Sequence, residues 1–169
     1  MNPMKRRRTA GAAYQAKLPT PFALLGIRTE GDVLAEITLL QQSAGALAPR
    51  DRLAARTCAQ IERYLEDFEF RFDLPVAFRG TPFQRRVWRQ ISAIGAGRTR
   101  SYGEIARELG SSPRAVGQAC GANPVPLVVP CHRVLAAGGV GGFAHHEGGF
   151  HLAVKRWLLA HEGAARGWQ

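Results

Sequence analysis

A cysteine followed directly by a histidine, Cys131–His132, is the pair in this sequence with the clearest capacity for chemistry. A thiol is nucleophilic as its thiolate, and a neighbouring imidazole can lower the pKa of that thiol. Prolines at positions 124, 126 and 130 precede the pair. They exclude a helix there and restrict the backbone. We therefore predict that Cys131 is a reactive group on a stiffened segment; the alternative is an inert buried thiol beside a core histidine.

A histidine-rich stretch raises the question of a metal site. It contains His145, His146, Glu147 and His151. Cysteine or histidine partners at the spacing of recognised metal sites are absent from the sequence. The pattern therefore favours a solvated polar loop, and we expect no metal and no cofactor.

Composition places the chain among globular proteins. Its 169 residues are 46% hydrophobic, which suits one domain or two small ones with a real core. No run approaches the ~20 apolar residues of a membrane span, and the basic start leads into no apolar segment of a secretory signal. Three cysteines without paired spacing indicate a reducing compartment. We expect an intracellular protein, cytoplasmic and associated with the nucleoid.

The positive charge is concentrated in one part of the chain. The formal net charge is +10, and residues 85–133 hold eight basic and two acidic side chains. More than half of the excess charge therefore lies in the segment that leads to Cys131. This distribution indicates a polyanionic partner such as nucleic acid, although a solvated basic face would carry the same charges.

The elements that must position Cys131 begin with a small N-terminal module. Hydrophobic patterning predicts strands over 22–29 and 33–40, joined by the turn Glu30–Gly31–Asp32. A helix is predicted over 53–65, with Cys58 as a small buried residue, and a strand over 68–72. We predict that residues 1–79 form an α/β support module, with residues 1–18 disordered.

From Thr81 onward the pattern becomes helical. Thr81 can cap a helix that carries Phe83, Val87, Trp88 and Ile91 on one face. Ser101 and Glu104 then form a capping box for a helix over 102–109.

After a turn at 110–113, residues 114–122 form a second short helix of small side chains. The pair has the outline of a helix-turn-helix, and an ordinary αα-corner is the alternative. The smooth second helix suits close, sequence-independent contact such as a minor groove. A final helix over 152–161, anchored by Leu152, Trp157 and Leu159, ends next to Glu162.

Together these motifs resemble a known family. Pro130–Cys131–His132–Arg133–Val134 follows Arg114–Ala115–Val116–Gly117 and Asn123–Pro124, in the order of the O6-alkylguanine-DNA alkyltransferases. Ser101–Tyr102–Gly103–Glu104–Ile105–Ala106 and the stretch from Lys155 to Gly163 match as well. The resemblance is dense over about residues 80–163 and loose before them.

The resemblance implies a role for each matching residue. Cys131 would accept the alkyl group, His132 would take the thiol proton through a water, and Glu162 would orient that imidazole. Asn123 would pin the turn before the cysteine, and Tyr102 would lie near the extruded base. Arg114 would take the place of the extruded guanine in the duplex. The implied DNA contacts are Arg114, Tyr102, Ser101, Ala115, Gly117, Gln118 and Arg133, and the implied base pocket is lined by Pro126, Val134, Phe143 and Ala144.

The chain departs from the family pattern at three places. The turn before Arg114 is about two residues shorter than usual. Phe143 stands where tyrosine is frequent, which removes one hydroxyl. The segment Ala144–His151 is longer than the usual link, which bears on the pocket and on the range of alkyl groups. Zinc ligands of the kind found in some relatives are not evident, because residues 1–57 contain no cysteine.

The expected fold is α/β (α+β): the N-terminal module of residues 1–79 and a mainly helical domain of residues 80–169 with a winged-helix-like helix-turn-helix. The expected function is single-turnover transfer of an alkyl group from O6-alkylguanine, or O4-alkylthymine, to Cys131 after base flipping. The expected partner is double-stranded alkylated DNA. The protein is expected to act as a monomer and to have no membrane partner. A non-catalytic binder of alkylated DNA and a Cys–His hydrolase are the alternatives.

Overall fold

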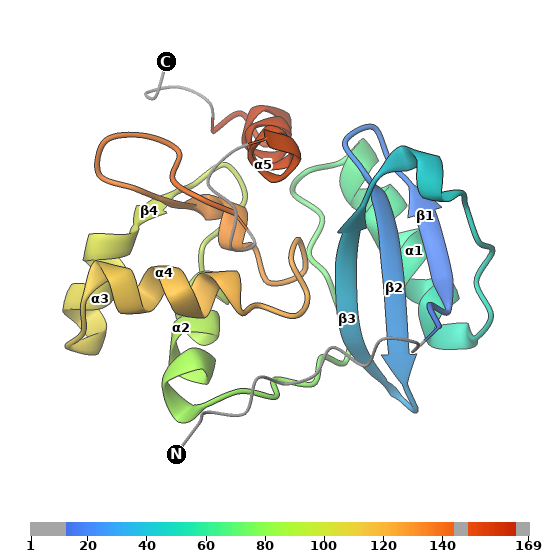
Figure 1. Cartoon of the computed structure of the whole chain (residues 1–169), viewed down its shortest axis with the longest axis horizontal. Coiled ribbons are helices and arrows are strands. Elements are labelled where there is room, and N and C mark those ends of the chain that lie inside the picture. Colours follow the sequence, from blue (N-terminus) through green and yellow to red (C-terminus); the bar gives the residue numbers. More distant parts are fainter. Residues whose placement is uncertain (1–12, 144–148, 165–169) are drawn as a thin grey trace.

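The computed structural model describes residues 13–143 and 149–164, and its N-terminal half is built on a three-stranded antiparallel sheet (Figure 1). The strands are β1 (Ala16–Pro19), β2 (Leu24–Glu30) and β3 (Val33–Leu40), in the order β1-β2-β3. Gly31, at a φ of +59°, supplies the left-handed turn between β2 and β3. The predicted hairpin is therefore confirmed.

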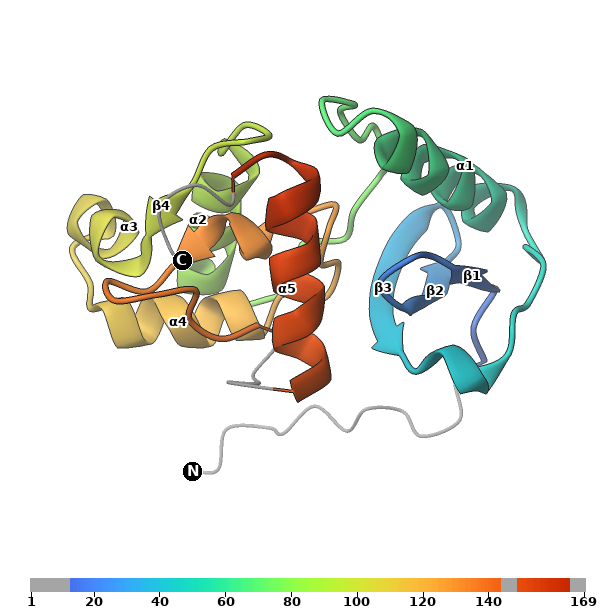
Figure 2. The same ribbon diagram turned by 90° about the horizontal axis from the view of Figure 1, so that it is seen from above.

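Helix α1 (Arg52–Glu66) packs along this sheet (Figure 2) after the short 3-10 helix η1 (Gln42–Ala44). The side chain of Asp51 accepts a hydrogen bond from the backbone N–H of Ala54 and so caps the helix. The predicted helix is confirmed, Cys58 is buried as expected, and the buried face extends to Tyr64, which is 1% exposed. The buried side chains of α1 are Ala54, Thr57, Cys58, Ile61 and Tyr64.

Two expectations for this half were wrong. Ala16–Pro19 form β1 and pair with β2, where the sequence predicted disorder through residue 18; this strand is too short to produce a pattern and gains order from its partner. Residues 68–72 form no strand, because the aromatic rings of the segment pack against α1 instead of joining a sheet edge. The ring centroids of Phe72 and Tyr64 lie 5.6 Å apart, and the guanidinium of Arg63 lies 5.3 Å from the centroid of Phe70.

The C-terminal half is mainly helical, as predicted. Thr81 caps α2 (Pro82–Ser92) through a capping box with Gln84, and Ser101 caps α3 (Tyr102–Leu109) through a capping box with Glu104. A turn that contains Gly110, at a φ of +63°, joins α3 to α4 (Pro113–Gly121). The remaining elements are β4 (Arg100–Ser101), the 3-10 helix η2 (Cys131–Arg133), β5 (Val134–Leu135) and α5 (Gly149–His161), with β4 and β5 paired in parallel.

Helix α5 lies between the other C-terminal helices and the N-terminal module (Figure 2). Leu159 is buried as predicted, but Leu152 and Trp157 are only half-buried, and Val154, Lys155 and Leu158 occupy the core instead. The fully buried stripe of the helix therefore runs along Val154, Lys155, Leu158 and Leu159. Within the described ranges, no helix is long and apolar enough to cross a membrane.

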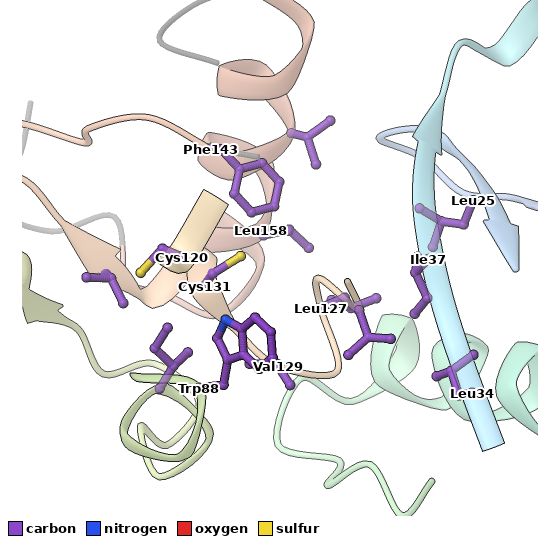
Figure 3. Close-up of a cluster of buried hydrophobic side chains, with 14 of the residues drawn as sticks. Leu25, Leu34, Ile37, Trp88, Cys120, Leu127, Val129, Cys131, Phe143 and Leu158 are labelled. Atoms are coloured by element: carbon purple, nitrogen blue, oxygen red, sulfur yellow. The ribbon is translucent and has the colours of Figure 1, made fainter. Parts of the chain in front are cut away.

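One hydrophobic core runs through both halves. Cys120, Cys131, Phe143 and Leu158 form part of it, and Leu127 lies between this group and the side chains of β3 (Figure 3). The backbone N–H of Ile37 in β3 donates to the carbonyl of Pro124 at 2.9 Å. Strand β3 therefore contacts and supports the segment that leads to Cys131.

Candidate active site

Asn123 clamps the loop that leads to Cys131. Its side-chain Nδ2 donates to the carbonyl of Val129 at 2.8 Å, and its Oδ1 accepts from the N–H of Val125 at 3.0 Å. Leu127, inside the clamped loop, has a φ of +77°, which a non-glycine residue adopts only where its surroundings impose it. The prolines and this clamp together give Cys131 a fixed backbone.

Cys131 itself is a protected thiol at the start of η2. It is 4% exposed, and burial raises the pKa of its thiol to about 11, although the Asn123 side chain and the nearby Lys155 act in the opposite direction. The expectation that the adjacent imidazole lowers this pKa is therefore corrected, because the His132 side chain bonds to Glu162 instead. The thiol is protonated at neutral pH and needs a base before it can react.

His132 is fully buried and paired with Glu162, from the end of α5. Its Nε2 donates to Glu162 Oε1 at 2.8 Å. Burial lowers the pKa of His132, and the hydrogen bonds from His132 and Arg133 hold the pKa of Glu162 well below its usual range. A neutral imidazole therefore faces an ionised carboxylate. The other ring nitrogen, Nδ1, is buried and has no hydrogen-bond partner within the described residues.

Arg133 forms an ion pair with the same Glu162 carboxylate. Its Nη2 donates to Glu162 Oε1 at 2.7 Å, its Nε donates to Oε2 at 3.0 Å, and its Nη1 donates to the carbonyl of Ile94 at 2.6 Å. The sequence placed Arg133 among the DNA contacts. This geometry favours a positioning role instead, because three of its nitrogen atoms are already engaged inside the protein.

Two buried polar side chains of this site were missed by sequence reasoning. The Tyr64 hydroxyl donates to Glu162 Oε1 at 2.8 Å from α1, 98 positions away. Lys155 Nζ donates to the carbonyls of Val134 at 2.7 Å and Gly142 at 2.9 Å. A lysine inside the apolar run of the last helix was the available signal for Lys155. For Tyr64 the only signal was its position three residues after Ile61, which places both side chains on the same face of the helix.

Tyr102 contacts Lys155 and the backbone of the segment 141–142. Its ring centroid is 5.7 Å from Lys155 Nζ, and its hydroxyl donates to the carbonyl of Gly142 at 3.4 Å. Gly141, at a φ of +74°, allows the backbone to approach this ring, since a Cβ there would lie 3.1 Å from it. Burial lowers the pKa of Lys155 to about 8. Tyr102 is therefore held at the same site as Cys131.

The other predicted residues lie around this centre or on α4. Pro126, Val134 and Phe143 are buried beside the cysteine segment, and Ala144 lies outside the described residues. On α4, Arg114 and Gln118 are exposed and Ala115 and Gly117 are half-buried; Ser101 is half-buried at the start of α3. His145, His146 and Glu147 also fall outside the described residues. Within the ranges 13–143 and 149–164, no three His, Cys, Asp or Glu side chains are grouped as metal ligands would be.

Comparison with known proteins shows the family to which the chain belongs. The family description "6-O-methylguanine DNA methyltransferase, DNA binding domain" matches residues 82–164. A methylated-DNA–protein-cysteine methyltransferase from Mycolicibacterium paratuberculosis is 40% identical over 149 residues, which cover 85% of this chain and 88% of that protein. The chain belongs to the methylated-DNA–protein-cysteine methyltransferase family.

Solved structures of methyltransferases from this family share the whole fold. The Mycobacterium tuberculosis O6-methylguanine methyltransferase superposes with a TM-score of 0.74 at 33% identity, covering 92% of this chain and 95% of that one. The same organism's protein in complex with DNA gives a TM-score of 0.71 at 34% identity, covering 88% and 92%. The mixed α/β fold expected from the sequence is therefore confirmed.

Proposed function

We propose that this protein repairs alkylated DNA by transferring the alkyl group of O6-alkylguanine to Cys131, once per molecule. The observation that carries this proposal is a buried proton relay, formed by Cys131, His132 and Glu162, in a chain that belongs to the methyltransferase family. Cys131 sits on a clamped loop, and beside it His132 is paired with Glu162 through Nε2 and presents an unpartnered Nδ1. Such an imidazole can accept a proton at Nδ1 while the carboxylate stabilises the resulting positive charge.

The proposed reaction is a displacement at saturated carbon. The Cys131 thiol gives its proton to His132 Nδ1 through a water, and the thiolate attacks the alkyl carbon. The S–C bond forms as the C–O6 bond breaks, and guanine leaves as an anion with the bonding electron pair. That anion takes up one proton, which balances the proton that the thiol gave to His132. Tyr102 is the proposed hydrogen-bond donor to the leaving O6. Burial raises the pKa of the Tyr102 hydroxyl above its ordinary value, so it remains protonated.

The return of the enzyme to its starting state would require cleavage of a thioether. A thioether resists hydrolysis, and the relay at Cys131 is built to deprotonate a thiol rather than to activate water against an S–C bond. The reaction is therefore stoichiometric, and each molecule acts once.

Delivery of the base is assigned to α3 and α4. Because a stacked base is out of reach of Cys131, it must be extruded at a cost of a few kcal/mol. We propose that α3, α4 and the paired strands β4 and β5 act as a winged-helix-like helix-turn-helix on double-stranded DNA. The exposed Arg114 at the start of α4 would fill the place of the extruded guanine. The small side chains Ala115 and Gly117 allow the close approach to a minor groove.

The remaining parts of the proposal concern organisation. The N-terminal module supports the acceptor loop through the Ile37–Pro124 hydrogen bond, and the protein acts as a monomer. Pro126, Val134 and Phe143 line the pocket for the base.

Intact-mass measurement after incubation with duplex DNA that carries one O6-methylguanine tests the function. We expect a gain of one methyl group that maps to Cys131, and no gain in Cys131→Ser. DNA binding without a mass gain in the native protein would instead identify a non-catalytic binder and overturn the proposal.

A further inference from the structure

The Glu162 carboxylate accepts hydrogen bonds from three side chains in two distant parts of the chain. Its Oε1 accepts from His132 Nε2 at 2.8 Å, from Arg133 Nη2 at 2.7 Å and from the Tyr64 hydroxyl at 2.8 Å. Two of these donors belong to η2, next to Cys131, and the third comes from α1 in the N-terminal module. The hydrogen bond from Tyr64 therefore links the support module to the carboxylate that orients His132, the proposed general base.

Tyr64 is held rigidly enough to make this link a fixed one. It is 1% exposed, its ring lies edge-on to His161 with centroids 5.2 Å apart, and its carbonyl accepts from His161 Nε2 at 3.0 Å. Burial raises the pKa of its hydroxyl far above the ordinary value. The hydroxyl therefore stays protonated and donates its hydrogen bond to Glu162.

We propose that Tyr64 is a positioning residue of the acceptor site: its hydroxyl shares the Glu162 carboxylate with His132 and so keeps that imidazole uncharged and free to take the thiol proton. This inference rests on the proposed function and extends it to the N-terminal module. Each donor to a carboxylate neutralises part of its charge and weakens its pull on a neighbouring proton. If the hydroxyl were absent, the full carboxylate charge would act on the imidazole. His132 would then become protonated at a higher pH than in the native protein.

The charged groups around His132 fit this account. Glu162 favours its protonated form, whereas Arg133, Lys155 and burial disfavour it. Tyr64 acts on the first of these, because its hydroxyl donates a hydrogen bond to the Glu162 carboxylate. Its removal should therefore change the balance in one direction, toward the imidazolium.

The test uses Tyr64→Phe in the full-length protein, because phenylalanine keeps the ring contacts and removes only the hydroxyl. Tyr14→Phe is the matched control, since the Tyr14 hydroxyl makes no hydrogen bond with the described residues. The single-turnover rate constant for methyl transfer is measured from about pH 5 to pH 9 on duplex DNA with one O6-methylguanine, with protein in saturating excess. DNA affinity and thermal unfolding are measured alongside.

We expect the acid limb of the pH–rate profile to move to higher pH by about half a unit to one unit in Tyr64→Phe, a threefold to tenfold slower transfer on that limb. The alkaline plateau, the DNA affinity and the control should stay within about twofold of the native protein. A profile that does not shift, that shifts to lower pH, or that falls equally at every pH overturns the proposal. The last of these outcomes is what a purely structural role would produce.

A second measurement separates this inference from the proposed function. The ¹⁵N NMR shifts of the His132 ring can be titrated in the unreacted protein, with the signal assigned through His132→Gln. We expect the imidazole to titrate at a higher pH in Tyr64→Phe than in the native protein, and an unchanged titration overturns the inference. If the native protein transfers no methyl group, the proposed function fails while this titration still reports on Tyr64.

Discussion

His132 Nε2 and Glu162 Oε1 lie 2.8 Å apart although 30 positions separate the two residues in the chain. Both side chains are fully shielded from solvent. The pair joins η2, which starts with the acceptor cysteine, to the C-terminal end of α5. The packing of α5 therefore determines whether Glu162 holds the His132 imidazole in the correct orientation.

Removing the charge of Glu162 should slow transfer more than DNA binding. In Glu162→Gln the imidazolium loses its stabilising carboxylate, and we expect methyl transfer to fall about 10- to 100-fold. DNA affinity, measured by fluorescence anisotropy, should change less than about twofold, because the Glu162 side chain is buried. Glu62→Gln, on the exposed side of α1, is the control. Equal losses in transfer and affinity would contradict the assigned role.

The stability of the protein should fall as the pH is lowered, in two steps. His132 has a lowered pKa in the folded state, so its cost appears below the unfolded value of about 6.5. Glu162 also has a lowered pKa, so its stabilisation is present above about pH 4.3 and is lost as the pH falls toward its folded value.

The free energy of unfolding in urea, measured across this range, checks both steps. Glu162→Gln should remove the lower step, and each unit of pKa depression corresponds to about 1.4 kcal/mol. A variant that keeps the full decline below about pH 4.3 would show that other carboxylates cause it.

Lys155 should matter for stability and for the shape of the site. Lys155→Met preserves the length of the side chain but leaves the carbonyls of Val134 and Gly142 without their donor. We expect a loss of about 1 to 3 kcal/mol in the free energy of unfolding, together with slower transfer. Arg156→Met, its exposed neighbour on α5, should change neither quantity. An unchanged stability would mean that the two carbonyls find other donors.

Arg114 should be needed for the duplex and not for the chemistry. Arg114→Ala removes the side chain proposed to replace the extruded guanine, so transfer from duplex DNA should fall about tenfold or more. Transfer from free O6-methylguanine base should stay within about twofold, because that substrate needs no extrusion. Arg107→Ala, exposed on α3, controls for the loss of one positive charge. Similar losses on both substrates would count against extrusion by Arg114.

Much of the local structure could be predicted from the sequence. The capping boxes at Thr81 and Ser101 and the hairpin at Gly31 depend on residues within a few positions of one another. For this reason the helices α2 and α3 and the strands β2 and β3 agree with the predictions. Residues 16–19 and 68–72 were predicted wrongly because their structure depends on a partner strand and on the ring of Tyr64, both distant in the chain.

The sequence by itself determined the reactive group and its stiffened frame, since Cys131, His132 and the prolines are adjacent in the chain. Only the tertiary structure decided how this group is controlled. It paired His132 with Glu162, engaged Arg133 inside the protein, and brought Tyr64 and Lys155 into the same buried region. These contacts arise from the packing of α1 and α5 against η2, and a buried polar atom takes whichever partner that packing supplies.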